Sequence, residues 1–205
     1  MIDFSANALI TVAEFNNLLG LSISDSDALR SLINAASDYI AEHTNRCLLD
    51  TTYTSEKYDG NGEYKLFLNN FPINSITHLY EWNTVDNAAA ITFYENTDYL
   101  YNQKEGWIYL SQGFTQGIQN YQVTYGAGYV KTAATGKILL PFDIRNACAQ
   151  LVQVYRKFKA KPGIISETIG TYSYSRENKN KDLRINGMAI PAEIADVISR
   201  YARLI

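Results

Sequence analysis

The sequence predicts an α+β fold, in which a small bundle of about four helices holds an inserted antiparallel β meander. Hydrophobic residues recur with a helical period near both ends of the chain and with a period of two across its middle. The length of 205 residues fits one domain, or one domain with a large insertion. We therefore expect a single domain over residues 1–205, with a β insertion at 51–130, an extended arm at 164–188 and a C-terminal helix at 190–205.

Two helices are predicted before residue 51. Thr11 and Glu14 form a capping box ahead of a short amphipathic segment, which Gly20 can end. Residues 24–27, Ser-Asp-Ser-Asp, repeat the capping signature. A continuous apolar stripe follows them, so we expect a second helix of about six turns.

Strand-like alternation begins at Thr51. The stretches "EYKLFL" (63–68) and "SITHLYEW" (75–82) each place alternate side chains on one face. The two predicted faces consist of Tyr64, Leu66 and Leu68, and of Ile76, His78, Tyr80 and Trp82. On this pattern we expect His78 to be packed. The stretch "DGNG" at 59–62 predicts a tight hairpin turn.

Two further helices are predicted after the strands. Pro141 and Asp143 favour a helix start, and Pro162-Gly163 favour its end. The apolar stripe between them consists of Ile144, Ala147, Cys148, Leu151, Val152 and Tyr155. Residues 164–188 are polar and extended, which is typical of an arm or a long hairpin, and Pro191 begins the last helix.

The stretch "YQVTYGAGYV" (121–130) tests whether the chain binds a nucleotide. A dinucleotide fingerprint needs a third glycine three residues after Gly128, and Lys131 stands there. A phosphate loop needs Gly-Lys followed by Ser or Thr, whereas Gly136-Lys137 precedes Ile138. We therefore interpret the two glycines of this stretch as the exit from a strand.

No catalytic residue, metal ligand or cofactor is predicted. His43 and His78 are the two histidines, and neither lies near a nucleophile motif. The stretch "DGNGE" (59–63) lacks the glycine and the glutamate that a calcium loop needs at its sixth and twelfth positions. Cys47 and Cys148 lack CxxC spacing and are expected to be free and half-buried. We also expect no membrane span and no cleaved signal.

The charge distribution argues against a protein that coats nucleic acid. The net charge is −3 and the pI is about 5.4. The arm is locally basic and contains tyrosines, so it is either a solvated loop or a segment that docks on a partner. The candidate partner-binding residues are Tyr172, Tyr174, Arg176, Lys179, Lys181 and Arg184 of the arm, with Tyr201, Leu204 and Ile205 at the end.

The order of these parts resembles the head–tail connector (adaptor) proteins of long-tailed phages and prophages. The opening 9–48, with its short helix, its long helix and the Thr44-Asn45-Arg46 step, is similar to theirs. The stretches "YKLFLNNFPINSITHLYEW", "YQVTYGAGYV" and "LPFDIRNACAQLVQVYRK" resemble their later strands and helix in the same order. The resemblance covers most of residues 9–160. It does not extend to the long meander between Asn83 and Gly117 or to the arm.

The resemblance implies a structural virion protein without enzymatic activity or cofactors. Such a protein docks on the portal protein as a ring, with dodecameric symmetry implied, after DNA packaging. It extends the channel, through which DNA passes without sequence-specific binding, and receives the head-closure stopper or the tail. The implied location is the head–tail interface of the virion, with the host cytoplasm as the site of assembly. A monomer in isolation is compatible with this role.

Two other functions remain open on the sequence. A tail-completion protein would share the same features within virion assembly. A β-rich module that binds a ligand or carbohydrate is favoured by Trp82, Trp107 and the 16 tyrosines, because aromatic rings can stack on sugars. An enzyme is the least supported class.

Overall fold

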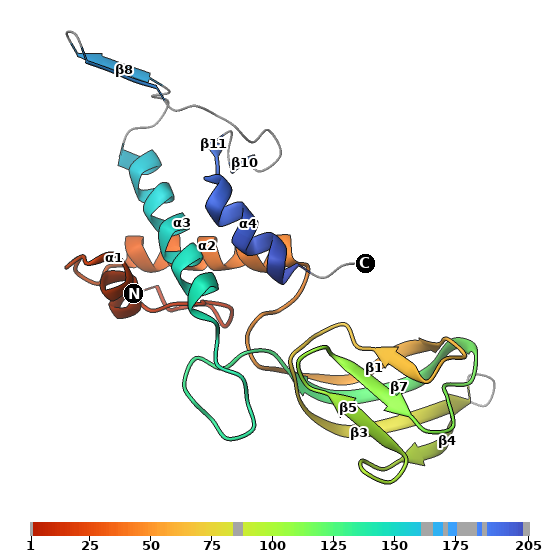
Figure 1. Cartoon of the computed structure of the whole chain (residues 1–205). Helices are drawn as coiled ribbons and strands as arrows, with labels where there is room; N and C mark the ends of the chain where they lie inside the picture. The colour runs from red at the N-terminus through yellow and green to blue at the C-terminus, as the bar shows by residue number, and fades with distance from the viewer. Residues whose placement is uncertain are drawn as a thin grey trace. The chain divides into compact units, whose positions relative to one another are not determined.

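Helices and antiparallel sheets share the chain, which confirms the predicted α+β class. The computed structural model describes residues 2–83, 88–160, 166–169, 172–175, 184–185 and 188–202. The chain divides into two units (Figure 1). The helical unit contains Met1–Asn45 and Pro141–Ile205, and the β unit contains Arg46–Leu140. That both units act as one domain, with an insertion at 51–130, stays a proposal.

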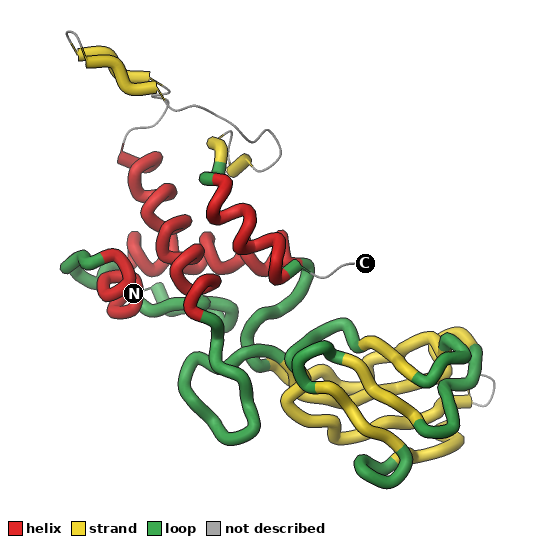
Figure 2. Tube along the Cα trace, in the orientation of Figure 1, coloured by secondary structure: helices red, strands yellow, loops and turns green. Residues whose placement is uncertain are grey.

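The helical unit contains four described helices (Figure 2): α1 (Val12–Leu19), α2 (Asp27–Thr44), α3 (Phe142–Ala160) and α4 (Ala192–Tyr201). The capping box of α1 is confirmed, because the Glu14 N–H donates to Thr11 Oγ1 and the Thr11 N–H donates to Glu14 Oε2. Gly20 ends α1 in the left-handed conformation, with a φ of 62°.

The start of α2 differs from the prediction. Ser26, and not Ser24, is the N-cap, and its Oγ accepts the Leu29 N–H at 3.3 Å. Asp25, just before the cap, is bound to Arg30. The helix has 18 residues, about five turns where about six were expected.

The core of the helical unit lies where the apolar stripes of α2, α3 and α4 meet. The predicted stripe of α3 is buried except for Tyr155, which is half-buried. Cys148 is fully buried, where half-burial was expected, and burial raises the pKa of its thiol to about 12. Ser37 is a buried polar residue of α2, and its hydroxyl is satisfied because it donates to Ile33 O and accepts the Leu9 N–H.

Two antiparallel sheets form the β unit (Figure 2). The larger has the order β1-β7-β3-β4 and the smaller has the order β2-β6-β5. Their strands are β1 (Thr51–Gly60), β2 (Lys65–Phe67), β3 (Ile73–Asn83), β4 (Ala88–Phe93), β5 (Tyr99–Asn102), β6 (Trp107–Leu110) and β7 (Gly117–Ala127). Hairpins join β3 to β4 and β5 to β6, whereas β7 lies between β1 and β3. Inward residues of both sheets share one core, which includes Tyr121, Val123 and Tyr125.

Irregular register in β3 overturns the predicted packing of His78. The pairing of β3 with β7 shifts between Ile73 and Ser75 and again between Ile76 and His78. Each shift changes the face to which the following residues belong. Ile73, Ile76 and Leu79 are therefore buried, whereas His78 is exposed.

Two further predictions on the strands are wrong. Tyr64 is exposed because β2 begins only at Lys65. The stretch 59–62 is not a tight hairpin turn, because β1 pairs with β7 while β2 pairs with β6. It carries the chain from one sheet to the other. The backbone at Gly60 passes so close to Thr115 O that a Cβ there would lie 1.8 Å away.

The two ends of the β unit are hydrogen-bonded to each other. The Asp50 N–H donates to Tyr129 O at 2.9 Å, and the Tyr129 N–H donates to Leu48 O at 2.7 Å. Gly128, the residue before Tyr129, has a φ of 117° and donates its N–H to Pro72 O. β7 ends at Ala127, and the next helix begins only at Phe142. The interpretation of Gly126 and Gly128 as a strand exit is confirmed.

Four short strands lie between α3 and α4. β8 (Ser166–Ile169) pairs antiparallel with β9 (Tyr172–Ser175), and β10 (Arg184–Ile185) pairs with β11 (Met188–Ala189). The predicted arm at 164–188 falls on these strands and on residues outside the described part of the chain.

Candidate functional site

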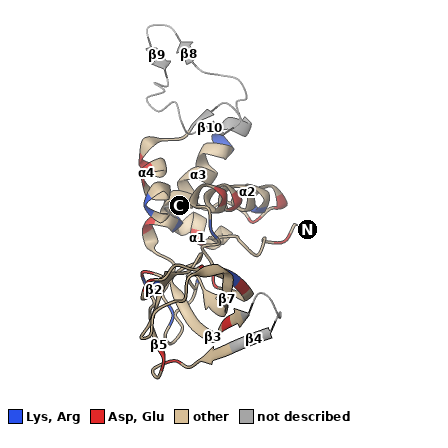
Figure 3. Ribbon diagram, turned by 90° about the vertical axis from the view of Figure 1, so that its right-hand side faces the viewer, with Lys and Arg blue, Asp and Glu red and all other residues tan. Residues whose placement is uncertain are grey.

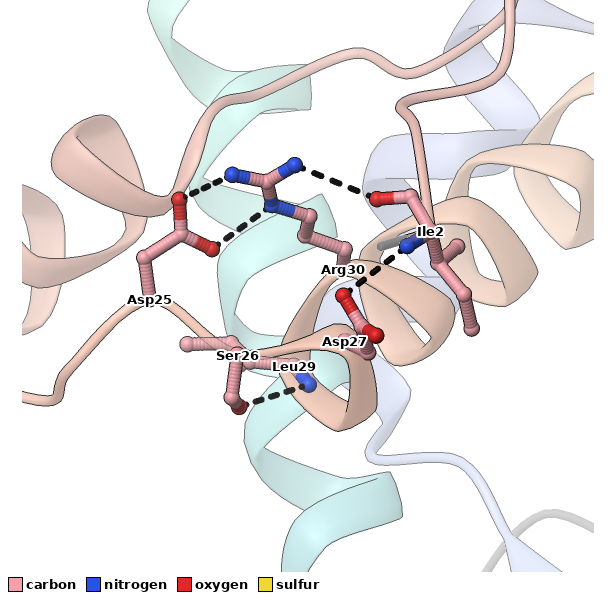
Figure 4. A network of polar contacts seen from close by, with 6 residues as sticks. All are labelled: Ile2, Asp25, Ser26, Asp27, Leu29 and Arg30. Atoms are coloured by element: carbon pink, nitrogen blue, oxygen red, sulfur yellow. Dashed lines mark hydrogen bonds and ion pairs between the residues drawn. The ribbon is translucent and has the colours of Figure 1, made fainter.

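A polar network holds the N-terminal strap, residues 2–5, against the start of α2 (Figure 4). Arg30 donates two hydrogen bonds to Asp25, at 2.7 and 2.5 Å, and a third to Ile2 O at 3.2 Å. The Ile2 N–H donates to Asp27 Oδ1, and the Ser5 N–H to an acceptor on α2. The hydrogen bonds and charge of Arg30 hold the pKa of the Asp25 carboxyl below its ordinary value. The network joins the strap to its own unit.

We expect Arg30→Ala to loosen the N-terminal strap. Removal of the guanidinium takes away the donors to Ile2 O and to Asp25, so amide hydrogen exchange at Ile2 and Ser5 should become about tenfold faster. Arg30→Lys keeps the charge but loses the paired geometry, and should give an intermediate rate. Because the pKa of Asp25 is lowered, the contact is present at neutral pH and is lost only as pH falls through that lowered pKa, which lies below the ordinary value of about 4. Unchanged exchange in Arg30→Ala would show that the strap is held by its other contacts.

Another polar network lies inside the β unit. Glu56 Oε2 accepts hydrogen bonds from the hydroxyls of Tyr58, at 2.7 Å, and Tyr125, at 2.6 Å. Its Oε1 accepts from Asn69 Nδ2, and the Asn69 N–H donates to Tyr58 Oη. Burial raises the pKa of Tyr125 to about 12 and raises that of Tyr58 as well. The network links β1 to β7 and to the segment before β3. It was not predicted from the sequence.

The outer face of the smaller sheet is aromatic. We call Tyr64, Phe67, Leu100, Trp107 and Tyr109 the aromatic platform. Tyr64, Phe67 and Leu100 are 56%, 60% and 55% exposed, and Tyr109 is 37% exposed. Phe67 pairs with Trp107, and Leu100 pairs with Tyr109, so all these strand residues share one face. The rings of Tyr64 and Tyr109 lie 6.1 Å apart and within 19° of parallel.

The platform also carries a cation. Lys65 pairs with Tyr109, and its Nζ lies 4.3 Å from the centre of the Trp107 ring. The Trp107 Nε1–H donates to Glu105 Oε2, which fixes the indole. Alternation in "KLF" and "WIYL" is the sequence signal for this face, because its outward positions hold Phe67, Trp107 and Tyr109.

The outer face of the larger sheet is polar by comparison. Its outward positions hold His78 and Tyr80 on β3, which stack on each other, and Gln122 and Thr124 on β7. This is the ordinary pattern for an antiparallel sheet with one face in water. Figure 3 shows charged residues scattered along the described parts of both units and not gathered on one element.

The predicted partner-binding residues fall into three groups. Tyr201 is half-buried, and its hydroxyl donates to Asp143 Oδ1 at 2.6 Å, so it also stabilises the contact of α4 with α3. Tyr172 and Tyr174 lie on β9, and Arg184 lies on β10. The others lie outside the described residues: Arg176, Lys179, Lys181, Leu204 and Ile205.

The described residues offer no candidate metal site and no candidate membrane-spanning helix. No group of three or more His, Cys, Asp or Glu side chains in this part of the chain could hold a metal ion. None of its helices is long and apolar enough to cross a membrane. Cys47 and Cys148 form no disulfide, and Cys47 is half-buried.

Comparison with known proteins identifies the family. The sequence matches the model of the "Head completion protein" family over residues 8–204. The chain belongs to the head completion protein family. Its role is therefore structural, as a connector between head and tail, and the family is one of virion components and not of enzymes. No curated protein matches the sequence.

Solved structures with the same fold come from phage-like particles. The chain is similar to a protein in the neck of an empty gene transfer agent particle computed with C6 symmetry, with a TM-score of 0.53. It is also similar to proteins in the native virion, with a TM-score of 0.54, and in the native neck computed with C12 symmetry, with 0.52. Identity is 16% in each case, with 99–100% of this chain and 94–96% of the other chain covered. At this identity the likeness shows the fold.

Proposed function

We propose that the head completion protein forms a ring that docks on the portal vertex after DNA packaging. The ring extends the DNA channel and receives the stopper or the tail. The observation that carries the proposal is that nearly the whole chain has both the family match and the fold of a neck protein solved with C12 symmetry. The acidic balance of the chain supports passage of DNA without binding. The location proposed is the virion, with assembly in the host cytoplasm.

Partner contacts are proposed for two segments of the helical unit, the arm and the end of the chain. The arm residues (Tyr172, Tyr174, Arg176, Lys179, Lys181 and Arg184) bind the portal or a neighbouring subunit. Tyr201, Leu204 and Ile205 at the chain end bind the portal. The apolar character of Leu204 and Ile205 suits a buried contact, and long segments between helices often carry binding functions.

Two measurements test this proposal. Light scattering over a concentration series, with negative-stain images of the heaviest fraction, should show rings with an open centre. Tagged portal protein should capture the full chain, and a chain that ends at Arg203 should be captured at least about tenfold less, as expected for loss of two buried apolar side chains. Glu193→Gln, an exposed substitution in α4 outside the proposed contact, is the control and should be captured like the full chain.

Capture by tail proteins in place of the portal would favour the tail-completion function. Equal capture of the full and shortened chains would overturn the assignment of Leu204 and Ile205. A chain that is monomeric throughout and is captured by neither partner would overturn the connector ring itself.

A further inference from the structure

The aromatic platform is not explained by the folding of the β unit. The inward faces of both sheets already form a core, and the larger sheet turns polar residues outward. The exposed fractions of the platform residues leave roughly 400 Å² of largely apolar surface in water, since a large aromatic side chain has about 150–250 Å² to bury. An exposed apolar patch of this size is often an interaction site.

Strand pairing arranges the outward residues of β2, β6 and β5 in two rows. The first row is Lys65, Tyr109 and Leu100, and the second row is Phe67, Trp107 and Asn102. Tyr64 adjoins the first row, because its ring stacks on the Tyr109 ring. Each row contains large apolar groups on neighbouring strands, so one row is a suitable cover for the other when two such faces pack together.

The two ends of the platform differ in charge. Beyond the first row, Glu63 lies just before β2 and Asp98 lies just before β5. Beyond the second row, Lys104 and Glu105 lie in the turn that joins β5 to β6, and Glu105 is already bonded to Trp107. Glu63 and Lys104 are both exposed. One end is therefore acidic and the other presents a cation, so the platform is complementary to a reversed copy of itself.

We propose that the aromatic platform binds the platform of a second copy of this chain, around a two-fold axis that runs across the strands. This axis lays the first row of one copy over the second row of the other. Glu63 and Asp98 of one copy then face Lys104 of the other, and Lys65 faces Glu105. A two-fold axis along the strands would instead bring Glu63 over Asp98, two carboxylates, so charge selects the first arrangement.

This contact goes beyond the proposed ring. A contact made by the same patch on both copies closes at two subunits, whereas a ring needs two different patches on each subunit. The platforms would bury roughly 800 Å² over both copies, which is below the area of most stable complexes, so the dimer is weak and dissociates readily. The platform therefore pairs free chains and leaves the ring contacts to other surfaces.

Sedimentation velocity of the full chain tests the contact, because it separates monomer, dimer and ring by size. We expect dimers at concentrations up to about 500 µM, where a weak contact becomes populated. Phe67→Glu should raise the dissociation constant of the dimer at least about tenfold, because it places a charge within the contact. Phe67 is 60% exposed, so this variant should fold like the parent chain, which its urea midpoint checks.

Ile118→Glu is the matched control for the loss of an exposed apolar side chain. Ile118 is 79% exposed and lies on β7 of the larger sheet, away from the three strands of the platform. Its dissociation constant should stay within about twofold of the parent value, since surface changes outside a contact have small effects.

A charge exchange tests the two-fold arrangement itself. Glu63→Lys alone or Lys104→Glu alone places like charges together twice in each dimer, so each variant should dimerise about fivefold more weakly than the parent chain. In an equal mixture, a Glu63→Lys chain that meets a Lys104→Glu chain again joins opposite charges at both places. We expect the mixture to regain dimers to within about twofold of the parent chain, as the symmetry requires.

Three results would overturn the proposal. A parent chain without dimers over the whole concentration range would mean that no second copy occupies the platform. Equal weakening by Phe67→Glu and Ile118→Glu would assign the dimer to another surface. A mixture of the two charge variants that dimerises no better than either variant alone would exclude the two-fold arrangement.

Portal capture and ring images are scored separately on the same chains. Rings and portal capture without dimers would overturn the platform contact and leave the connector function intact. Dimers without rings or portal capture would support the platform contact and overturn the proposed function. Rings that are lost in Phe67→Glu would place the platform inside the ring and overturn the two-fold contact.

Discussion

Replacement of Gly128 with alanine is expected to cost the β unit about 3–5 kcal/mol of its free energy of unfolding, since backbone strain and steric overlap add. Gly128 has a φ of 117°, a conformation that side chains rarely adopt. An added Cβ would lie 2.4 Å from Leu49 O and 2.5 Å from Leu49 C. Both are backbone atoms of the paired ends of the unit, so they cannot swing away as a side chain would.

Gly136→Ala is the matched control for this measurement. Gly136 also has a positive φ, 74°, but no atom lies within 4 Å of its added Cβ. Its substitution should therefore cost only about 1 kcal/mol, the strain alone. Urea unfolding of the full chain, followed by tyrosine and tryptophan fluorescence, measures both variants. Equal midpoints for the two variants would show that the contact with Leu49 relaxes without cost.

Glu56→Ala is expected to destabilise the β unit by about 3 kcal/mol, because hydrogen bonds to a charged group are the strong ones. The substitution removes the acceptor for the hydroxyls of Tyr58 and Tyr125 and for the Asn69 amide. Both tyrosine rings are buried, so their hydroxyls lose partners that water cannot easily replace.

Glu56→Gln separates the hydrogen bonds from the side-chain volume. The glutamine amide keeps one acceptor oxygen, but its NH2 group replaces the other oxygen. That NH2 group then faces a hydrogen-bond donor, to which it cannot bond. We expect about half the loss seen with alanine, about 1.5 kcal/mol, in the same urea measurement. A glutamine variant as unstable as the alanine variant would assign the whole effect to the charge and the second acceptor oxygen of the carboxylate, which glutamine lacks. An alanine variant as stable as the parent chain would mean that the network makes no net contribution.

The helical unit follows from its sequence because local rules determine it. The Thr11–Glu14 box and the α3 stripe depend on residues three or four positions apart, and both are present in the structure. The cap of α2 lies two residues after the predicted position, because Ser24 and Ser26 are both suitable capping residues and the structure uses Ser26. Competition of this kind depends on the fold and is not visible in a spacing pattern.

The β unit follows its sequence less closely because its register is set by partners far along the chain. The pattern around His78 assumes regular alternation, and two irregularities in the pairing with β7 reverse it. The Glu56 network joins residues up to 69 positions apart, and no motif marks it. The platform could be found only after β2, β5 and β6 were known to be neighbours. The partner-binding residues stay predictions, since contacts with another molecule leave no spacing signal within one chain.

The paired ends of the β unit make it an insertion whose entry and exit points lie side by side. Because Leu48 and Asp50 bond to Tyr129, the chain leaves the unit beside the point where it enters. The folded β unit thus connects α2 to α3 as a short loop would. The number of residues in the unit therefore adds little to the entropic cost of bringing α2 and α3 together. Insertions or deletions within the unit are therefore expected to leave the helical unit folded. Variation in the family should then concentrate between α2 and α3.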